Sequence, residues 1–138
     1  MKYTTEKYKL KRATSGSAGF DLYSMDTVVL TPGCKPRKVN TGVRVQIPEG
    51  YVGLVFIRSS VGTKRQVTLA NNVGVIDSDY RGPIIVALTN SGKENTVIQA
   101  GERVAQLVVV PFMGDAEDVD QLDKTERGDG GFGFTGTN

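Results

Sequence analysis

Residues 43–57 read Val43-Arg-Val-Gln-Ile-Pro-Glu-Gly-Tyr-Val-Gly-Leu-Val-Phe-Ile57, and this stretch indicates the fold class. Its first five residues alternate apolar and polar side chains, which is typical of a strand with one buried and one solvated face. The Pro-Glu-Gly segment at 48–50 favours a turn, and residues 51–57 are again rich in β-branched and aromatic side chains. The stretch therefore predicts two strands separated by a turn.

The same composition recurs along the rest of the chain. Further runs rich in β-branched residues are expected to be strands, at 28–30, 84–88, 96–98 and 104–112. Turn-forming residues such as Thr31-Pro-Gly33 and Asn90-Ser-Gly92 separate these runs. No window has a convincing helical period, although residues 116–122 could form one helical turn. Many short strands in a chain of 138 residues predict one all-β domain of the jelly-roll type, a sandwich or a barrel.

The charge pattern argues against nucleic acid as a partner. The net charge is only +2, and acidic and basic residues are interspersed along the chain. The one local basic cluster consists of Lys7, Lys9, Lys11 and Arg12, and we interpret it as a solvated face. No apolar run approaches membrane-spanning length and the amino terminus has no apolar signal region, so we expect a cytoplasmic protein without a membrane partner.

The absent and rare residue types exclude several kinds of site. The chain has no histidine, which removes Ser-His-Asp triads, histidine general bases and histidine metal ligands. Cys34 is the only cysteine, so neither an intrachain disulfide nor a multi-cysteine zinc site can form. Proton transfer near neutral pH must then depend on a carboxylate, a lysine, a tyrosine or this single thiol.

A chemically rich segment lies in mid-chain: Asn71-Asn-Val-Gly-Val-Ile-Asp-Ser-Asp-Tyr-Arg-Gly82. An apolar strand at 73–76 would end at Asp77, and the run at 84–88 would follow a Gly-Pro turn, which predicts a β-hairpin with carboxylates and a phenol at its mouth. A carboxylate in this place can orient a water molecule as a general base. Alternatively, the Asp-Ser-Asp sequence only supplies hydrogen bonds to a turn. The segment alone does not decide between the two interpretations.

The carboxy-terminal segment differs in composition from the rest. From Asp115 onward apolar residues become rare and acids accumulate, which predicts a β-barrel domain at 1–114 and an arm at 115–138. The arm ends in a glycine-rich stretch, residues 127–136, which also carries a guanidinium group, two aromatic rings and a hydroxyl. Such a stretch could be a flexible linker, or it could close over a nucleotide. Roughly fifteen extended residues between Phe112 and Arg127 span about 50 Å, enough to reach a neighbouring subunit.

Five separated motifs resemble those of the trimeric dUTPases, the dUTP nucleotidohydrolases, in the order of that family. The motifs are Ala18-Gly-Phe-Asp-Leu-Tyr-Ser24, Arg58-Ser-Ser60, Asn71 through Gly82, Gly101-Glu-Arg-Val-Ala-Gln-Leu107 and Arg127 through Gly136. The resemblance implies a jelly-roll-like β-barrel that forms a homotrimer. It also implies active sites at subunit interfaces, each covered by the arm of another subunit. The implied reaction splits dUTP into dUMP and pyrophosphate with Mg²⁺, which keeps uracil out of DNA and supplies dUMP for dTMP synthesis.

The resemblance also implies roles for individual residues. Asp77 would be the base that activates water for in-line attack on the α-phosphorus, and Tyr80 would stack on the deoxyribose and exclude a 2′-hydroxyl. The backbone near Gly74 and Ile85, together with Asn71, would bind the edge of the uracil. Asp21 would hold waters on Mg²⁺. Phe132 of the arm would cover the uracil. The other implied substrate-binding positions, most of them at the phosphates, are Arg58, Ser59, Ser60, Gln106, Arg127, Gly133 and Thr135.

One position departs from the family pattern, because Phe134 stands where the family usually has serine. We expect activity to be retained, since Arg127, Phe132 and Thr135 are present. Two alternative functions remain at this point. Related dCTP deaminases share the fold but typically use a glutamate base, and a non-catalytic regulatory binding module would not need Asp77.

Overall fold

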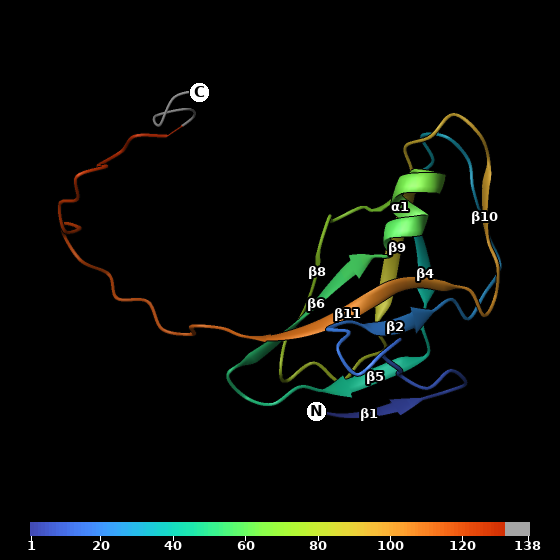
Figure 1. Cartoon of the computed structure of the whole chain (residues 1–138), viewed down its shortest axis with the longest axis horizontal. Helices are drawn as coiled ribbons and strands as arrows, with labels where there is room; N and C mark the ends of the chain where they lie inside the picture. Colours follow the sequence, from blue (N-terminus) through green and yellow to red (C-terminus); the bar gives the residue numbers. More distant parts are fainter. Residues whose placement is uncertain (132–138) are drawn as a thin grey trace.

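The computed structural model of the chain describes residues 1–131, and its regular secondary structure is almost entirely β-strand (Figure 1). One short helix, α1, interrupts the strands at Ser59–Arg65. The strands are β1 Lys2–Thr5, β2 Phe20–Tyr23, β3 Val28–Leu30, β4 Arg37–Asn40, β5 Val43–Gln46, β6 Tyr51–Ile57, β7 Val67–Leu69, β8 Gly74–Ile76, β9 Ile85–Asn90, β10 Thr96–Ile98 and β11 Arg103–Pro111. The predicted all-β class is confirmed.

The strands form two larger sheets and two ribbons, and every pairing is antiparallel. The larger sheets have the orders β2-β11-β6-β8 and β4-β9-β7, and the ribbons are β1-β5 and β10-β3. Side chains from both larger sheets and from both ribbons join one hydrophobic core. The alternation predicted for residues 43–47 is present, because β5 buries Val43 and Val45 and exposes the two residues that follow them.

One glycine is needed where the core packs most tightly. A Cβ built on Gly53 of β6 would lie 2.6 Å from Cδ1 of Ile47 and 2.9 Å from Cδ1 of Leu107. Carbon atoms in van der Waals contact lie about 3.5–4.0 Å apart, so any side chain here would push these residues away. The glycine therefore allows β6 to approach both β11 and the end of β5.

The prediction that the strands at 73–76 and 84–88 form a β-hairpin is wrong. Strand β8 pairs with β6, whereas β9 pairs with β4 and β7, so the chain crosses from one larger sheet to the other between them. Ile84 explains the crossing, because its side chain is buried in the core and its backbone bonds to the β4–β5 connection. Its amide donates to the carbonyl of Val43 at 2.8 Å, and its carbonyl accepts from the amide and the hydroxyl of Thr41.

Helix α1 was not predicted, because its sequence carries no apolar period. Only Val61 of its seven residues is buried, and the helix contains a glycine and two β-branched residues. It ends at Gln66, which adopts a left-handed conformation with φ of 54° and donates its amide to the helix carbonyls. No helix forms at 116–122.

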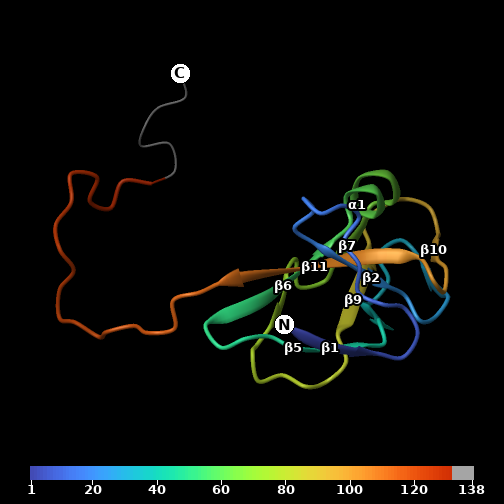
Figure 2. The same cartoon turned by 60° about the horizontal axis from the view of Figure 1, so that its bottom comes forward.

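After β11 the chain leaves the sheets. Residues 112–131 contain no strand or helix and are exposed almost throughout, and the two views show them extending away from the sheets (Figures 1 and 2). Among residues 1–131, no helix has the length and apolar character that crossing a bilayer requires.

Candidate functional site

One group of predicted site residues gathers at the end of the four-stranded sheet. Asp21 of β2 lies opposite Gln106 of β11, and Arg58 directly follows β6, the next strand of the same sheet. The Asp21 carboxylate forms an ion pair with Arg58, whose Nε lies 3.4 Å from Oδ1, and its Oδ2 accepts a hydrogen bond from Nη1 of Arg103 at 3.2 Å. Its side chain is only 12% exposed, so both of its oxygens face guanidinium groups within a partly closed site.

The backbone holds this first group, which we call the arginine–aspartate cluster (Asp21, Arg58, Arg103 and Gln106). The amide of Arg58 donates to the carbonyl of Val104 at 3.1 Å, which ties the end of β6 to β11. A Cβ built on Gly19 would lie 2.5 Å from Oε1 of Gln106, so this glycine leaves room for the glutamine side chain.

Ser59 and Ser60 begin α1 beside Arg58, and both are exposed. A cleft of about 520 Å³ opens here and is lined by Ser60 together with Arg58, Arg103 and Lys64. The guanidinium, ammonium and hydroxyl groups along this cleft suit the oxygens of a phosphate chain. In the described part of the chain, no three acidic or cysteine side chains lie close enough together to hold a metal ion alone.

A second group of predicted residues lies around the crossing loop, residues 77–84. Asp77 follows β8 directly and is exposed. Tyr80 is 41% exposed, and its hydroxyl donates to the carbonyl of Pro83 at 3.0 Å. A Cβ built on Gly82 would lie 2.5 Å from Cζ of Tyr80, so the tyrosine ring packs directly on this glycine.

The remaining members of the second group flank β8 and β9. Asn71 precedes β8, and its Nδ2 would lie 3.9 Å from a Cβ built on Gly74. Ile85 begins β9 and is 49% exposed. A cleft of about 380 Å³ adjoins this group, lined by Asp77, Asp79 and apolar side chains that include Val75. The ring of Tyr80 and the amide of Asn71, with backbone groups beside them, could bind a polar ring. The exposed carboxylate of Asp77 could direct a water molecule.

The structure does not bring the two groups together within one chain. Ile76 pairs with Gly53 of β6, and Arg58 lies five residues further along that strand, about 17 Å away at the usual rise. Because the strands are antiparallel, Asp77 continues in the opposite direction from Arg58. The carboxylate and the arginine–aspartate cluster therefore lie at opposite ends of β6.

Arg127 of the arm has no described contact with either group. Arg127 is exposed, and its Nε donates to the carbonyl of Gly130 at 2.8 Å. Phe132, Gly133, Phe134 and Thr135 lie outside the described residues.

Two arginines that sequence reasoning left without a role occupy prominent places. Arg103 binds Asp21, and Arg81 donates to backbone carbonyls of the crossing loop. Both lie inside motifs quoted above, so the sequence contained them, but only the fold shows which groups they contact.

The family model for dUTPase matches residues 5–136, which is nearly the whole chain. The chain belongs to the dUTPase family. A relative from Desulfitobacterium hafniense (strain DSM 10664 / DCB-2), a deoxyuridine 5′-triphosphate nucleotidohydrolase, is 49% identical over 128 residues, covering 90% of this chain and 84% of the relative.

Solved dUTPases share the fold. The Staphylococcus bacteriophage 80alpha dUTPase with dUPNHPP superposes with a TM-score of 0.89 at 29% identity, covering 99% of this chain and 98% of the phage chain. A variant of the dUTPase from phage phi11 of S. aureus superposes with a TM-score of 0.77 at 27% identity, covering 91% and 97%, and it coordinates a structural Mg(II) ion.

Proposed function

We propose that this protein hydrolyses dUTP to dUMP and pyrophosphate. The observation that carries the proposal is the gathering of Asp21, Arg58 and Gln106 at one end of the four-stranded sheet, beside a cleft that Arg58 lines, in a chain of the dUTPase family. The bound dUPNHPP in the phage 80alpha relative supports a nucleotide of this kind as the substrate. The reaction would remove dUTP from the cytoplasmic pool and leave dUMP for dTMP synthesis.

The arginine–aspartate cluster and the helix start would hold the triphosphate. Arg58 would bind the phosphates with Ser59 and Ser60, whose hydroxyls are exposed beside it, and Gln106 would add an amide donor. Because the reaction transfers charge onto the leaving pyrophosphate, such fixed donors favour the transition state.

Asp77 would act as the general base. It would accept a proton from a water molecule while the water oxygen forms a bond to the α-phosphorus. The bond from that phosphorus to the bridging oxygen breaks at the same time, and pyrophosphate leaves. The exposed position of Asp77 at the end of β8 supports this role, since the carboxylate is free to face a nucleotide.

The surroundings of Asp77 suit a deoxyuridine. Tyr80 would stack on the deoxyribose and leave no room for a 2′-hydroxyl. Backbone groups at Gly74 and Ile85, with the amide of Asn71, would bind the edge of the uracil. Uracil has the acceptor O4 at the position where cytosine has the amino donor N4. A fixed hydrogen-bond donor opposite this position therefore favours uracil over cytosine.

Asp21 fits a magnesium ion that is bound mainly by phosphates. Mg²⁺ keeps several waters and takes one or two carboxylates in addition to substrate oxygens, and Asp21 is one such carboxylate beside the proposed phosphate site. When bound, Mg²⁺ supplies neutralisation of charge on the phosphate oxygens. Asp21 itself would bind water molecules of the hydrated metal. Arg58 would leave its ion pair with Asp21 and bind a phosphate of the substrate instead.

The separation of the two groups supports a site built between copies of the chain. One chain holds Asp77 and Arg58 at opposite ends of β6, so a complete site needs Asp77 from one copy and Arg58 from another. We therefore propose a homotrimer of jelly-roll-like barrels, each formed by residues 1–114. The arm at 115–138 would cover a neighbouring site and bring Arg127, Phe132, Gly133 and Thr135 to the nucleotide.

The products formed from each nucleotide test the proposed reaction. With Mg²⁺ present, dUTP should give dUMP and pyrophosphate, while dCTP and UTP should stay intact. Release of ammonia from dCTP would instead indicate the deaminase alternative. Asp77→Asn should bind dUTP without turnover, whereas Asp79→Asn, in the same exposed loop, serves as the matched control. A binding module without catalysis would leave dUTP uncut in every case.

Mixed assemblies test the shared site. Asp77→Asn and Arg58→Ala subunits should each be inactive, but refolding them together should restore turnover at about one quarter of the sites, because only those sites combine both intact residues. A mixture as inactive as its components would contradict a site shared between copies.

A further inference from the structure

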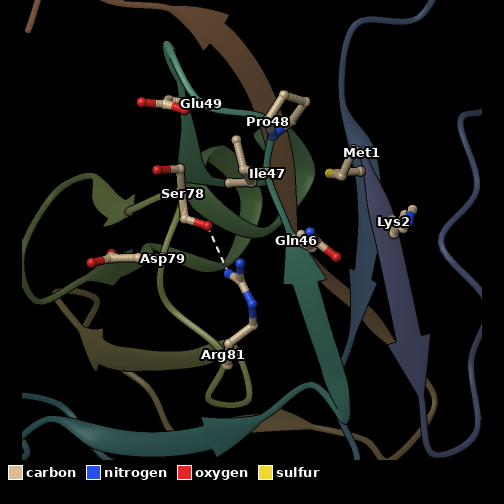
Figure 3. Close-up of a pocket in the computed structure, with 9 residues that line it drawn as sticks. All are labelled: Met1, Lys2, Gln46, Ile47, Pro48, Glu49, Ser78, Asp79 and Arg81. Carbon is tan, nitrogen blue, oxygen red and sulfur yellow. Dashed lines mark hydrogen bonds between the residues drawn. The ribbon is translucent and has the colours of Figure 1, made fainter.

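Arg81 folds back over the loop that carries Asp77 and Tyr80. Its Nη1 donates to the carbonyl of Ser78 at 2.6 Å and to the carbonyl of Tyr80 at 2.9 Å. Figure 3 shows the bond to Ser78 at the wall of a cleft of about 500 Å³, with Asp79 beside it. A guanidinium group bound to a carbonyl makes a charge-assisted hydrogen bond, which is stronger than a neutral one.

A second arginine ties the same loop to another part of the fold. Nη1 of Arg44, on β5, donates to the backbone carbonyl of Arg81 at 3.0 Å. Strand β5 belongs to the ribbon with β1, and neither strand belongs to the sheets that contain β8 and β9. Two guanidinium groups therefore bind the loop at three carbonyl positions, 78, 80 and 81.

Few other interactions restrain residues 77–83. The backbone bond described within this segment joins the amide of Tyr80 to the carbonyl of Asp77 at 3.2 Å, and the next anchor is Ile84. Asp77, Asp79, Tyr80 and Arg81 are all exposed, so the packing of the loop comes mainly from the Tyr80 ring on Gly82. The Tyr80 hydroxyl also binds the carbonyl of Pro83. A loop with few buried contacts opens easily unless specific bonds hold it.

We propose that Arg81 is a positioning residue that fixes the backbone between Asp77 and Tyr80, so that the carboxylate and the aromatic ring keep their places relative to the nucleotide. The inference rests on the proposed roles of these two residues. Arg81 itself does not touch the substrate in this scheme. Because a displacement of about 1 Å can lower a rate about a hundredfold, loss of the guanidinium should act mainly on turnover.

The test compares Arg81→Ala and Arg81→Lys with the parent protein. Arg81→Ala should lower kcat for dUTP by about 10- to 100-fold, with a smaller change in KM and an unchanged melting temperature. Arg81→Lys keeps the charge and should retain intermediate activity. Added guanidinium ion should partly restore kcat of Arg81→Ala, because the vacated place opens into the solvent cleft. Arg37→Ala, which removes another exposed arginine from β4, is the matched control and should keep the parent kcat.

The results distinguish the positioning role of Arg81 from a purely stabilising role and from failure of the proposed function. If the parent protein hydrolyses dUTP and Asp77→Asn does not, but Arg81→Ala keeps the parent kcat, the positioning role is wrong and the proposed function stands. If Arg81→Ala loses activity only in proportion to a lower melting temperature and guanidinium does not restore it, Arg81 serves stability alone. If the parent leaves dUTP intact, the proposed function itself fails.

Discussion

Replacing Gly82 by alanine is expected to change nucleotide selectivity without unfolding the protein. A Cβ on Gly82 would lie 2.5 Å from Cζ of Tyr80, whereas contacting carbon atoms need about 3.5 Å, so the ring must move by about 1 Å. Gly82 does not have a left-handed φ, so alanine adds no backbone strain. Tyr80 is 41% exposed, so its ring can swing outward, at the cost of the hydrogen bond to Pro83, which contributes about 0.5–1.5 kcal/mol.

The functional effect should exceed the effect on stability. If Tyr80 excludes the 2′-hydroxyl, a displaced ring should lower kcat/KM for dUTP by about 10- to 100-fold and reduce the preference for dUTP over UTP. Steady-state rates with both nucleotides give this ratio, and chemical denaturation gives the free energy of unfolding.

Gly16→Ala is the matched control, because a Cβ at Gly16 meets no atom within 4 Å. It should leave both the selectivity and the stability unchanged. If Gly82→Ala keeps the parent selectivity and the parent kcat/KM, then Tyr80 does not set the sugar preference through its packing on Gly82.

Three further substitutions test other parts of the scheme. Asp21→Asn should raise the Mg²⁺ concentration needed for half-maximal rate by about tenfold or more, measured in a metal titration; an unchanged titration curve would remove Asp21 from the metal site. Gly53→Ala should lower the free energy of unfolding by about 1–3 kcal/mol through overpacking against Ile47 and Leu107, measured with denaturant, and an equal midpoint would contradict the tight approach of β6. Phe134→Ser should change kcat/KM for dUTP by less than about a hundredfold. A larger gain would mean that Phe134 severely impairs the contribution of the arm to catalysis.

The strands that sequence reasoning identified are those with dense apolar or alternating runs. Strands β3, β6 and β10 begin and end where predicted, and β5, β9 and β11 differ by one or two residues at their ends. Four strands were missed: polar and charged residues dominate β1 and β4, and β2 and β7 are only four and three residues long. Helix α1 was missed because it buries a single side chain.

The candidate site was predictable only as separate pieces. Each motif could be found along the chain, because its residue types suit phosphate, sugar or base. The ion pairs of Asp21 with Arg58 and Arg103 join residues far apart in sequence, so no local pattern contains them. The same holds for the bond from Arg44 to the carbonyl of Arg81.

The sequence by itself determined the strand-forming segments and the chemistry that each motif carries, because side-chain alternation and residue type are local properties. Tertiary structure alone decided that β8 and β9 enter different sheets, that Asp77 and Arg58 lie at opposite ends of β6, and that Arg44 binds the carbonyl of Arg81. These arrangements depend on which strands pair and which side chains share the core. Such non-local choices follow from the packing of the whole chain, as the burial of Ile84 beside the β4–β5 connection illustrates.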